Sequence, residues 1–234
     1  MESGVRGLKK QLTALCRRAA VEFVKGEKKS VSVSARRLSK FLDQKPIIHE
    51  SILKEKAPGV VTGLAWTAAG GEILFIETKM VNGSGKVQIT GQLGDVMKES
   101  VSIALTLVKA LFPEQPELFE KHDIHIHVPA GAVPKDGPSA GITLTTALAS
   151  LVSGNAVSPE FAMTGEVSLR GVVMPIGGLP EKLMAAERAG IKKVFIPEEN
   201  VRDLDDVAKE VKEKLEIIPV HQVSEVLKKT KVIK

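Results

Sequence analysis

At the centre of this sequence stands Pro129-Ala-Gly-Ala-Val-Pro-Lys-Asp-Gly-Pro-Ser139-Ala-Gly141. Residues 124–128 before it have the pattern of a short apolar strand, and residues 142–153 after it are a run of helix formers. The segment contains three prolines and three glycines, so its backbone cannot continue a sheet ladder and must form a loop of its own shape. Ser139 is therefore predicted to stand where the following helix begins, with Pro138 just ahead of it.

A serine at the start of a helix has two common roles. Its hydroxyl can cap the helix by accepting a hydrogen bond from a backbone N–H, which is the more frequent case. It can also act as a nucleophile beside the N–H groups that a helix leaves unpaired. The second interpretation needs a base within reach of Ser139, so it depends on a partner elsewhere in the sequence.

Length and composition fit a globular chain with one large domain, or one domain with an appendage: it has 234 residues, of which 43% are hydrophobic. No stretch approaches the roughly 18 consecutive apolar residues of a membrane span, and the N-terminus lacks the apolar core of a signal peptide. Cys16 is the only cysteine, so an internal disulfide is excluded and a reducing, cytoplasmic location is expected. We expect no membrane partner.

The net charge of +5 comes from 33 basic and 28 acidic residues that are spread along the chain. Aromatic residues make up only 3%, and there is no tyrosine. This composition allows weak contact with DNA, but it does not predict a dedicated nucleic-acid-binding protein.

The first 45 residues differ from the rest. Apolar residues recur at helical spacing over 5–23, residues 31–33 alternate like a short strand, and residues 36–42 suggest another helical turn or two. These elements are too few to form a core. We interpret residues 1–45 as the end of a helical domain and residues 46–58 as a connector.

From residue 59 to residue 234 the pattern is that of a mixed α/β domain. Strands are predicted at 60–66, 72–80, 86–90, 124–128, 193–196 and 215–220, with a strand and a tight return at 161–174. Helices are predicted at 93–111, from 139 onward, from about 176 to 189, at about 200–214 and at 223–229.

Two segments look like binding motifs, one for phosphate and one for a metal, but each lacks residues that its motif requires. Gly83-Ser-Gly-Lys86 looks like part of a phosphate-binding loop, but Met80 and Val87 stand where the motif needs a glycine and a Ser or Thr. His125 and His127 share one face of a strand, as two metal ligands would, yet no third ligand accompanies them. A hairpin turn is the better interpretation of residues 83–86. For the two histidines, packing or support of the neighbouring loop is the better interpretation, and no metal is expected.

One alternative for Ser139 is a catalytic triad. Gly137-Pro-Ser139-Ala-Gly141 matches the Gly-x-Ser-x-Gly elbow of α/β-hydrolases. The remaining triad members, in the chain order of that fold, would be one of Asp203, Asp205 and Asp206, and then His221. The elbow requires a strand that runs directly into the serine, whereas Ser139 follows a loop that contains prolines.

A lysine is the other candidate base. An ordinary lysine has a pKa near 10.4, which must fall by about 3 units before the amine can accept a proton at neutral pH. Lys182 meets this requirement best, because Leu179 and Leu183 flank it. Pro180 fits the first position of a helix, so the amine would lie near the positive end of the helix dipole, which lowers its pKa further. Taken alone, a solvent-facing lysine is the more frequent case.

Together these segments resemble the proteolytic domain of the Lon family of ATP-dependent proteases, over about residues 59–230. The matching motifs are Gly63-Leu-Ala-Trp66, Gly94-Asp-Val-Met-Lys-Glu-Ser100, Asp123-Ile-His-Ile-His-Val-Pro129, Pro134-Lys-Asp-Gly-Pro-Ser-Ala-Gly141, Met163-Thr-Gly-Glu-Val-Ser-Leu-Arg-Gly171 and Pro175-Ile-Gly-Gly-Leu-x-Glu-Lys182. The spacing between Ser139 and Lys182 also agrees with the family. The resemblance implies the α/β (α+β type) fold of the Lon proteolytic domain, with a small N-terminal helical appendage.

The resemblance implies a peptidase with a Ser–Lys dyad, in which Ser139 is the nucleophile and Lys182 the general base. Thr164 matches a family threonine whose hydroxyl orients the lysine, and backbone N–H groups around Ser139 would form the oxyanion hole. Where the family usually has an additional lysine this chain has Pro180, which leaves Lys182 as the base. Positions that line or shape the family's active site match Glu77, His125, His127 and Asp136.

The N-terminal part resembles the end of the Lon ATPase module, the AAA+ helical lid subdomain, in which Arg6 matches an arginine that senses nucleotide. The Walker sequences are absent, so the resemblance predicts an excised fragment that uses no cofactor itself, whereas the full-length enzyme uses ATP and Mg²⁺. The implied partners are unfolded or damaged protein substrates and, in the intact enzyme, further copies of the chain in a homo-hexamer.

The rival function is that of a non-proteolytic Lon-type domain, which acts in assembly or in association with DNA. Such relatives keep the fold and lose the dyad. The presence of Ser139, Lys182 and Thr164 therefore favours the peptidase.

Overall fold

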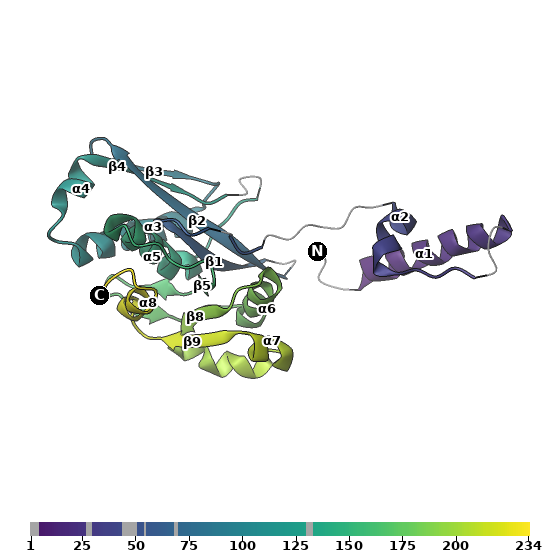
Figure 1. Cartoon of the computed structure of the whole chain (residues 1–234). Helices are drawn as coiled ribbons and strands as arrows, with labels where there is room; N and C mark the ends of the chain where they lie inside the picture. The colour runs from purple at the N-terminus through teal and green to yellow at the C-terminus, as the bar shows by residue number, and fades with distance from the viewer. Residues whose placement is uncertain (1–4, 27–29, 44–50, 54, 68–69, 130–132) are drawn as a thin grey trace. The chain divides into compact units, whose positions relative to one another are not determined.

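The computed structural model describes residues 5–26, 30–43, 51–53, 55–67, 70–129 and 133–234. Its contacts divide the chain into two units, one formed by residues 1–49 and 68–70 and the other by residues 50–67 and 71–234. Each unit has its own helices, and the sheet belongs to the second (Figure 1). Among the described residues, no helix combines the length and the apolar character that crossing a bilayer requires.

The N-terminal unit is helical. Its longest helix, α1 (Arg6–Val24), follows the predicted apolar spacing, yet none of its residues is buried. A 3₁₀ turn, η1 (Ala35–Arg37), leads into α2 (Leu38–Leu42), where Phe41 is buried and the Arg37 guanidinium lies 5.0 Å from the centre of its ring. With so little buried apolar surface, the described part of this unit has no core of its own.

The strand predicted at 31–33 is wrong. Residues 30–34 are irregular, and no strand in the described chain pairs with them. Alternation over three residues matches the period of a strand, but a strand also needs a neighbour that satisfies its backbone N–H and C=O groups.

The second unit contains a seven-stranded sheet with the strand order β3-β4-β2-β1-β5-β8-β9. The pairs β1–β5, β5–β8, β8–β9 and β3–β4 are parallel, whereas β2 and β4 are antiparallel. The strands are β1 (Val60–Thr67), β2 (Gly70–Asn82), β3 (Val87–Thr90), β4 (His122–His127), β5 (Phe161–Met163), β8 (Lys193–Pro197) and β9 (Glu216–Val220). A separate antiparallel pair is formed by β6 (Glu166–Val167) and β7 (Val173–Met174). The predicted α/β fold is confirmed.

Helices cover both faces of this sheet (Figure 1). Val61 and Phe195 belong to a core cluster with α3, α5 and α8, whereas Leu64 and Ile196 belong to a second cluster with α6 and α7. Because successive side chains of a strand point to opposite faces, the two clusters lie on opposite sides of the sheet. The helices are α3 (Asp95–Leu111), α5 (Gly141–Ser153), α6 (Leu179–Ala189), α7 (Lys209–Lys214) and α8 (Val223–Lys229).

Helix α5 is buried over most of its length, between α3 and the sheet. Its Thr143 hydroxyl donates to the carbonyl of Met163 in β5 at 3.3 Å. A Cβ added to Gly141 would approach the backbone nitrogen of Val167 to 2.9 Å, so only glycine allows this close contact. The start of α5, two residues after Ser139, is therefore fixed against the segment that follows β5.

The predicted helices and strands of this unit agree with the structure, with three differences. A short helix, α4 (Pro116–Glu120), was not expected. The segment 161–174 contains three short strands. The helix predicted at 200–214 is divided into η3 (Glu198–Asp206) and α7, because Val207 between them is extended. Part of the predicted connector, residues 46–50 and 54, lies outside the described residues.

Candidate active site

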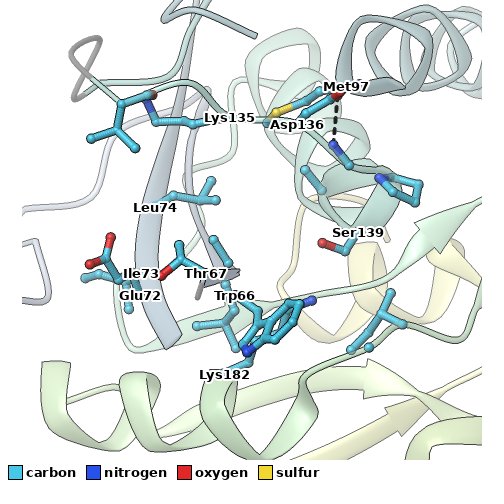
Figure 2. Close-up of a pocket in the computed structure, with 18 of the residues that line it drawn as sticks. Trp66, Thr67, Glu72, Ile73, Leu74, Met97, Lys135, Asp136, Ser139 and Lys182 are labelled. Atoms are coloured by element: carbon cyan, nitrogen blue, oxygen red, sulfur yellow. Dashed lines mark hydrogen bonds between the residues drawn. The ribbon is translucent and has the colours of Figure 1, made fainter. Parts of the chain in front are cut away.

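A pocket of about 440 Å³ has both Ser139 and Lys182 in its lining (Figure 2). Figure 2 shows the Ser139 side chain pointing into the space that Trp66 and Leu74 border. A pocket of this size accepts a few side chains of an extended polypeptide rather than a folded domain. Most of the lining is apolar, and it includes Leu64, Trp66, Ile73, Leu74, Phe75, Met97, Val133, Pro134, Pro138 and Ile176.

The position of Ser139 is set by the backbone around it. A 3₁₀ turn, η2 (Pro138–Ala140), precedes α5 directly, and Gly137 has a φ of +122°, which residues with a side chain rarely adopt. The Ser139 carbonyl accepts the Gly165 N–H at 2.9 Å, and the Gly165 carbonyl accepts the Ile142 N–H at 3.0 Å. These two hydrogen bonds tie the start of the helix to the segment after β5.

Ser139 does not cap the helix. The N-cap position of α5 is Ala140, and neither η2 nor α5 has a side-chain capping hydrogen bond. No described residue forms a hydrogen bond with the Ser139 hydroxyl. The more frequent interpretation of a serine at a helix start is therefore wrong here, and the hydroxyl is available to a ligand in the pocket.

Asp136 holds the same loop against the start of α3, and it also lines the pocket. Its Oδ1 atom accepts the backbone N–H of Met97 at 3.0 Å and that of Gly137 at 2.9 Å. Met97 is in the first turn of α3, where N–H groups lack partners within the helix and a carboxylate is favourable. Since a Cβ on Gly94 would come within 2.3 Å of this carboxyl group, glycine is required there for the approach.

Lys182 lies in the first turn of α6 and is only 2% exposed. Gly178 precedes the helix with a φ of +69°, and its carbonyl accepts the Lys182 N–H at 3.1 Å. Burial lowers the pKa of the Lys182 amine from its ordinary value of 10.5 to about 8. A large share of the amine is therefore neutral in mildly alkaline solution, as a general base requires.

Thr164, which is fully buried, connects the two groups. Lys182 Nζ donates to Thr164 Oγ1 at 3.1 Å, and Thr164 Oγ1 donates to the Ser139 carbonyl at 3.4 Å. Within the described residues, no hydrogen bond joins Lys182 Nζ directly to Ser139 Oγ. The amine and the serine therefore share the pocket and are linked through Thr164.

The other predicted site residues of this unit lie on β2 and β4, outside the lining of the pocket. Glu77 pairs with His127 across the two strands. The Thr90 hydroxyl holds both histidine rings, with distances of 2.9 Å to His125 Nε2 and 2.7 Å to His127 Nδ1. In the described parts of the chain, no group of three or more side chains is arranged to bind a metal ion. The roles of Glu77 and the two histidines in the active site stay predictions, as does that of Arg6 on α1.

The triad alternative is not supported by the geometry. His221 lies outside the pocket, and its Nδ1 atom is 3.8 Å from a carboxylate oxygen of Glu198. The described residues between β4 and η2, 128–129 and 133–137, form no strand that runs into Ser139. None of the three candidate aspartates, Asp203, Asp205 and Asp206, lines the pocket.

The turn at 83–86 is filled by a carboxylate from its own chain. Asp123 Oδ1 accepts the N–H of Ser84 at 2.8 Å and that of Lys86 at 2.9 Å. These hydrogen bonds lower the pKa of the Asp123 carboxyl group. The N–H groups that a phosphate would need are used within the protein, which agrees with the rejection of a phosphate-binding loop. The predicted hairpin turn is wrong, however, because the turn joins β2 to β3 and β4 lies between these two strands in the sheet.

Comparison with known proteins shows that most of the chain has the sequence of a proteolytic domain. Residues 32–232 match the family model of the Lon protease (S16) C-terminal proteolytic domain, and residues 1–31 match that of the Lon protease AAA+ ATPase lid domain. The chain belongs to the Lon protease family, as the resemblance of its motifs predicts. The domain boundaries predicted at 45/46 and 58/59 stay predictions.

Similar proteins come from distant organisms. Lon protease of Clostridium beijerinckii is 54% identical over 231 residues, which cover 98% of this chain and 29% of that protein. Lon protease of Methanosarcina barkeri is 53% identical over 230 residues, covering 97% of this chain and 29% of that protein. Lon protease of Brucella suis is 53% identical over 232 residues, which cover 98% of this chain and 29% of that protein. The chain thus spans less than a third of the length of these relatives.

Two residues of this region are not among the predicted site residues, although Trp66 belongs to one of the matching motifs. Trp66 lines the pocket while its side chain is largely exposed, at 58%. A tryptophan at the end of a strand in a chain with so few aromatic residues could have been noticed. Asn200, which binds the backbone of the pocket-lining Ile176, gives no comparable signal.

Proposed function

We propose that this chain hydrolyses peptide bonds, with Ser139 as the nucleophile and Lys182 as the general base. The observation that carries the proposal is a buried lysine, with a pKa lowered to about 8, in the same pocket as a serine hydroxyl that caps no helix. A neutral amine can accept the serine proton, whereas a protonated amine cannot.

The reaction follows from these two groups. Lys182 Nζ takes the proton of Ser139 Oγ while the oxygen attacks the carbonyl carbon of the scissile peptide bond. The protonated amine then gives its proton to the leaving nitrogen, and an acyl-enzyme ester remains on Ser139. Lys182 next takes a proton from a water molecule, whose oxygen attacks the ester carbonyl. The protonated amine returns this proton to Ser139 Oγ as the new carboxylic acid leaves, which restores both groups. Catalytic hydrogen bonds often tighten only with substrate bound, so the present link through Thr164 is compatible with this sequence of steps.

The tetrahedral intermediate carries a negative oxygen that needs hydrogen-bond donors. The backbone N–H groups of Ser139 and Ala140 are our candidates. They lie in η2, just ahead of α5 and beside the pocket. The positive end of the α5 dipole favours negative charge at the same place.

Thr164→Val tests the orienting role of the threonine. Valine has nearly the same shape as threonine. It can neither accept a hydrogen bond from Lys182 Nζ nor donate one to the Ser139 carbonyl. We expect kcat to fall by roughly 10- to 100-fold without being abolished, since a hydrogen bond to a charged group contributes about 1.5–3 kcal/mol. Steady-state peptide hydrolysis measures this. A variant as inactive as one without the serine would show that Thr164 does more than orient the lysine.

The apolar pocket makes the proposed activity testable with peptide boronates, which form covalent adducts with a nucleophilic serine. A boronate with a leucine-like side chain should modify Ser139, because burial of that side chain among Trp66, Leu74 and Met97 contributes roughly 1.5–3 kcal/mol. A boronate with an aspartate-like side chain should bind about 10- to 100-fold more weakly. Mass spectrometry of the adduct and inhibition of peptide hydrolysis give the readout. A chain that forms no adduct and cleaves no peptide would instead be the non-proteolytic module.

The partners and cofactors of a longer protein belong to the same proposal. We expect an ATPase module, using ATP and Mg²⁺ and with Arg6 sensing nucleotide, to deliver unfolded or damaged protein chains to this pocket within a homo-hexamer. For this chain alone we expect peptide hydrolysis to be independent of ATP. A cytoplasmic location, and contact with DNA that is at most weak, fit the single cysteine and the modest net charge of +5.

A further inference from the structure

Asn200, in η3, is only 1% exposed. A buried amide must form hydrogen bonds, because otherwise the loss of its hydration is not recovered. Its Oδ1 atom accepts the backbone N–H of Ile176 at 2.9 Å, and its Nδ2 atom donates to the backbone carbonyl of Ile176, also at 2.9 Å. One side chain thus pairs with both backbone groups of a single residue, as a neighbouring β-strand would.

Asp203 supports the orientation of this amide, because its carboxylate accepts a further hydrogen bond from Asn200 Nδ2. A reversed amide would place its oxygen against the Asp203 carboxylate and the Ile176 carbonyl, and its NH₂ group against the Ile176 N–H. The three hydrogen bonds therefore select asparagine in one orientation. Side chains without both a donor and an acceptor cannot replace it.

The residue that Asn200 holds belongs to the active-site pocket. Residues 175–177, which we call the 175–177 wall, join β7 to α6 and line the pocket that contains Ser139 and Lys182. Pro175 has no N–H, and among the described residues no other hydrogen bond to the backbone of the wall is found. The Ile176 side chain also packs against the apolar cluster that holds α6, so Asn200 supplies the hydrogen bonds that fix the backbone of the wall.

The catalytic lysine is held by other contacts. Helix α6 buries Leu179 and Leu183, which are 1% and 0% exposed, in the core cluster on its face of the sheet. Lys182 Nζ is bound to Thr164. None of these contacts involves Asn200, so a change at Asn200 displaces the wall and leaves the base in place.

We propose that Asn200 is a positioning residue for substrate binding, which holds the 175–177 wall where it receives the peptide chain. The inference rests on the proposed peptidase function of the same pocket. Without Asn200 the wall occupies its binding position for only part of the time. The apparent affinity for substrate then falls in proportion to that fraction, while the chemical step on bound substrate keeps its rate.

Asn200→Ala is the first test, with kcat and KM measured on a fluorogenic peptide across a range of pH. We expect KM to rise about tenfold and kcat to stay within about a factor of two. The apparent pKa of kcat should not move, because Lys182 keeps its surroundings. Asn155→Ala is the matched control: it also removes an amide donor to a backbone carbonyl, that of Val232 at 3.1 Å, but it lies outside the pocket lining and should leave KM unchanged.

Asp203→Ala is the second test, because it keeps the Ile176 pair and removes one of the three hydrogen bonds that hold the amide. We expect KM to rise about threefold, as for the loss of one hydrogen bond of modest net strength. An unchanged KM in a folded Asn200→Ala variant would overturn the proposal, as would a fall in kcat with a shifted pH profile. If thermal unfolding shows that Asn200→Ala does not fold, an unchanged KM in Asp203→Ala overturns it. Failure of the peptidase function itself is distinct, since the wild-type chain would then cleave no peptide and form no boronate adduct.

Discussion

Ser139→Ala is expected to abolish peptide hydrolysis, with kcat/KM reduced by about 10⁴-fold or more. The methyl group cannot form the acyl-enzyme, so Lys182 and the backbone N–H groups could only assist the direct attack of water. A fluorogenic peptide assay with a long incubation measures the residual rate. Activity close to that of the wild type would remove Ser139 from the mechanism.

The same variant should keep its fold, because the Ser139 hydroxyl caps no helix. The loss of a true N-cap would cost about 1 kcal/mol, whereas we expect the free energy of unfolding to change by less than about 0.5 kcal/mol here. Ser153→Ala is a matched control on the same helix, since that hydroxyl donates to the Ser150 carbonyl at 3.4 Å and lies outside the pocket. This control should keep full activity.

The periodic parts of the fold could be predicted because burial follows sequence spacing there. In α3, Met97, Val101, Ala104 and Val108 recur every three or four residues, and all four are buried. The prolines and glycines before Ser139 likewise predict a loop that ends in a helix, and the helical part, η2 followed by α5, is found. The local sequence pattern is sufficient to predict a helix or strand wherever one face of that element packs on the core.

The candidate site could be predicted only in part, because its contacts join segments far apart in the chain. Burial next to apolar neighbours singles out Lys182 among the lysines, and the structure places it in the pocket of Ser139. The pairing of Thr164 with both groups, and of Asn200 with Ile176, depends on how β5, β8 and α6 pack together. No spacing in the sequence encodes such contacts. The predicted N-cap failed for a related reason, since a 3₁₀ turn shifts the helix start past the serine.

Lys182→Arg should be as inactive as Lys182→Ala, although it keeps the positive charge. A guanidinium has a pKa above about 12, so it cannot accept the Ser139 proton at any pH the protein tolerates. In the wild type, kcat should rise with pH through an apparent pKa of about 8 and stay high in the alkaline range, as the buried amine becomes neutral. Substantial cleavage by Lys182→Arg would exclude the lysine as the general base, and His221 would then be the candidate base to test.

The stability of the fold gives an independent measure of the same ionisation. Folding lowers the pKa of Lys182 from 10.5 to about 8, so between these values the unfolded chain binds more protons than the folded chain and stability rises with pH. Below this window the buried charge costs the fold about 3 kcal/mol, and above it the cost vanishes. Lys182→Met keeps the length of the side chain without the amine. It should therefore be more stable than the wild type near neutral pH, with an advantage that shrinks as the pH approaches 10.5. Chemical denaturation of both proteins at two pH values measures this difference. An advantage that does not change with pH would mean that Lys182 ionises normally in the folded protein, and a normally ionising lysine could not act as the base near neutral pH.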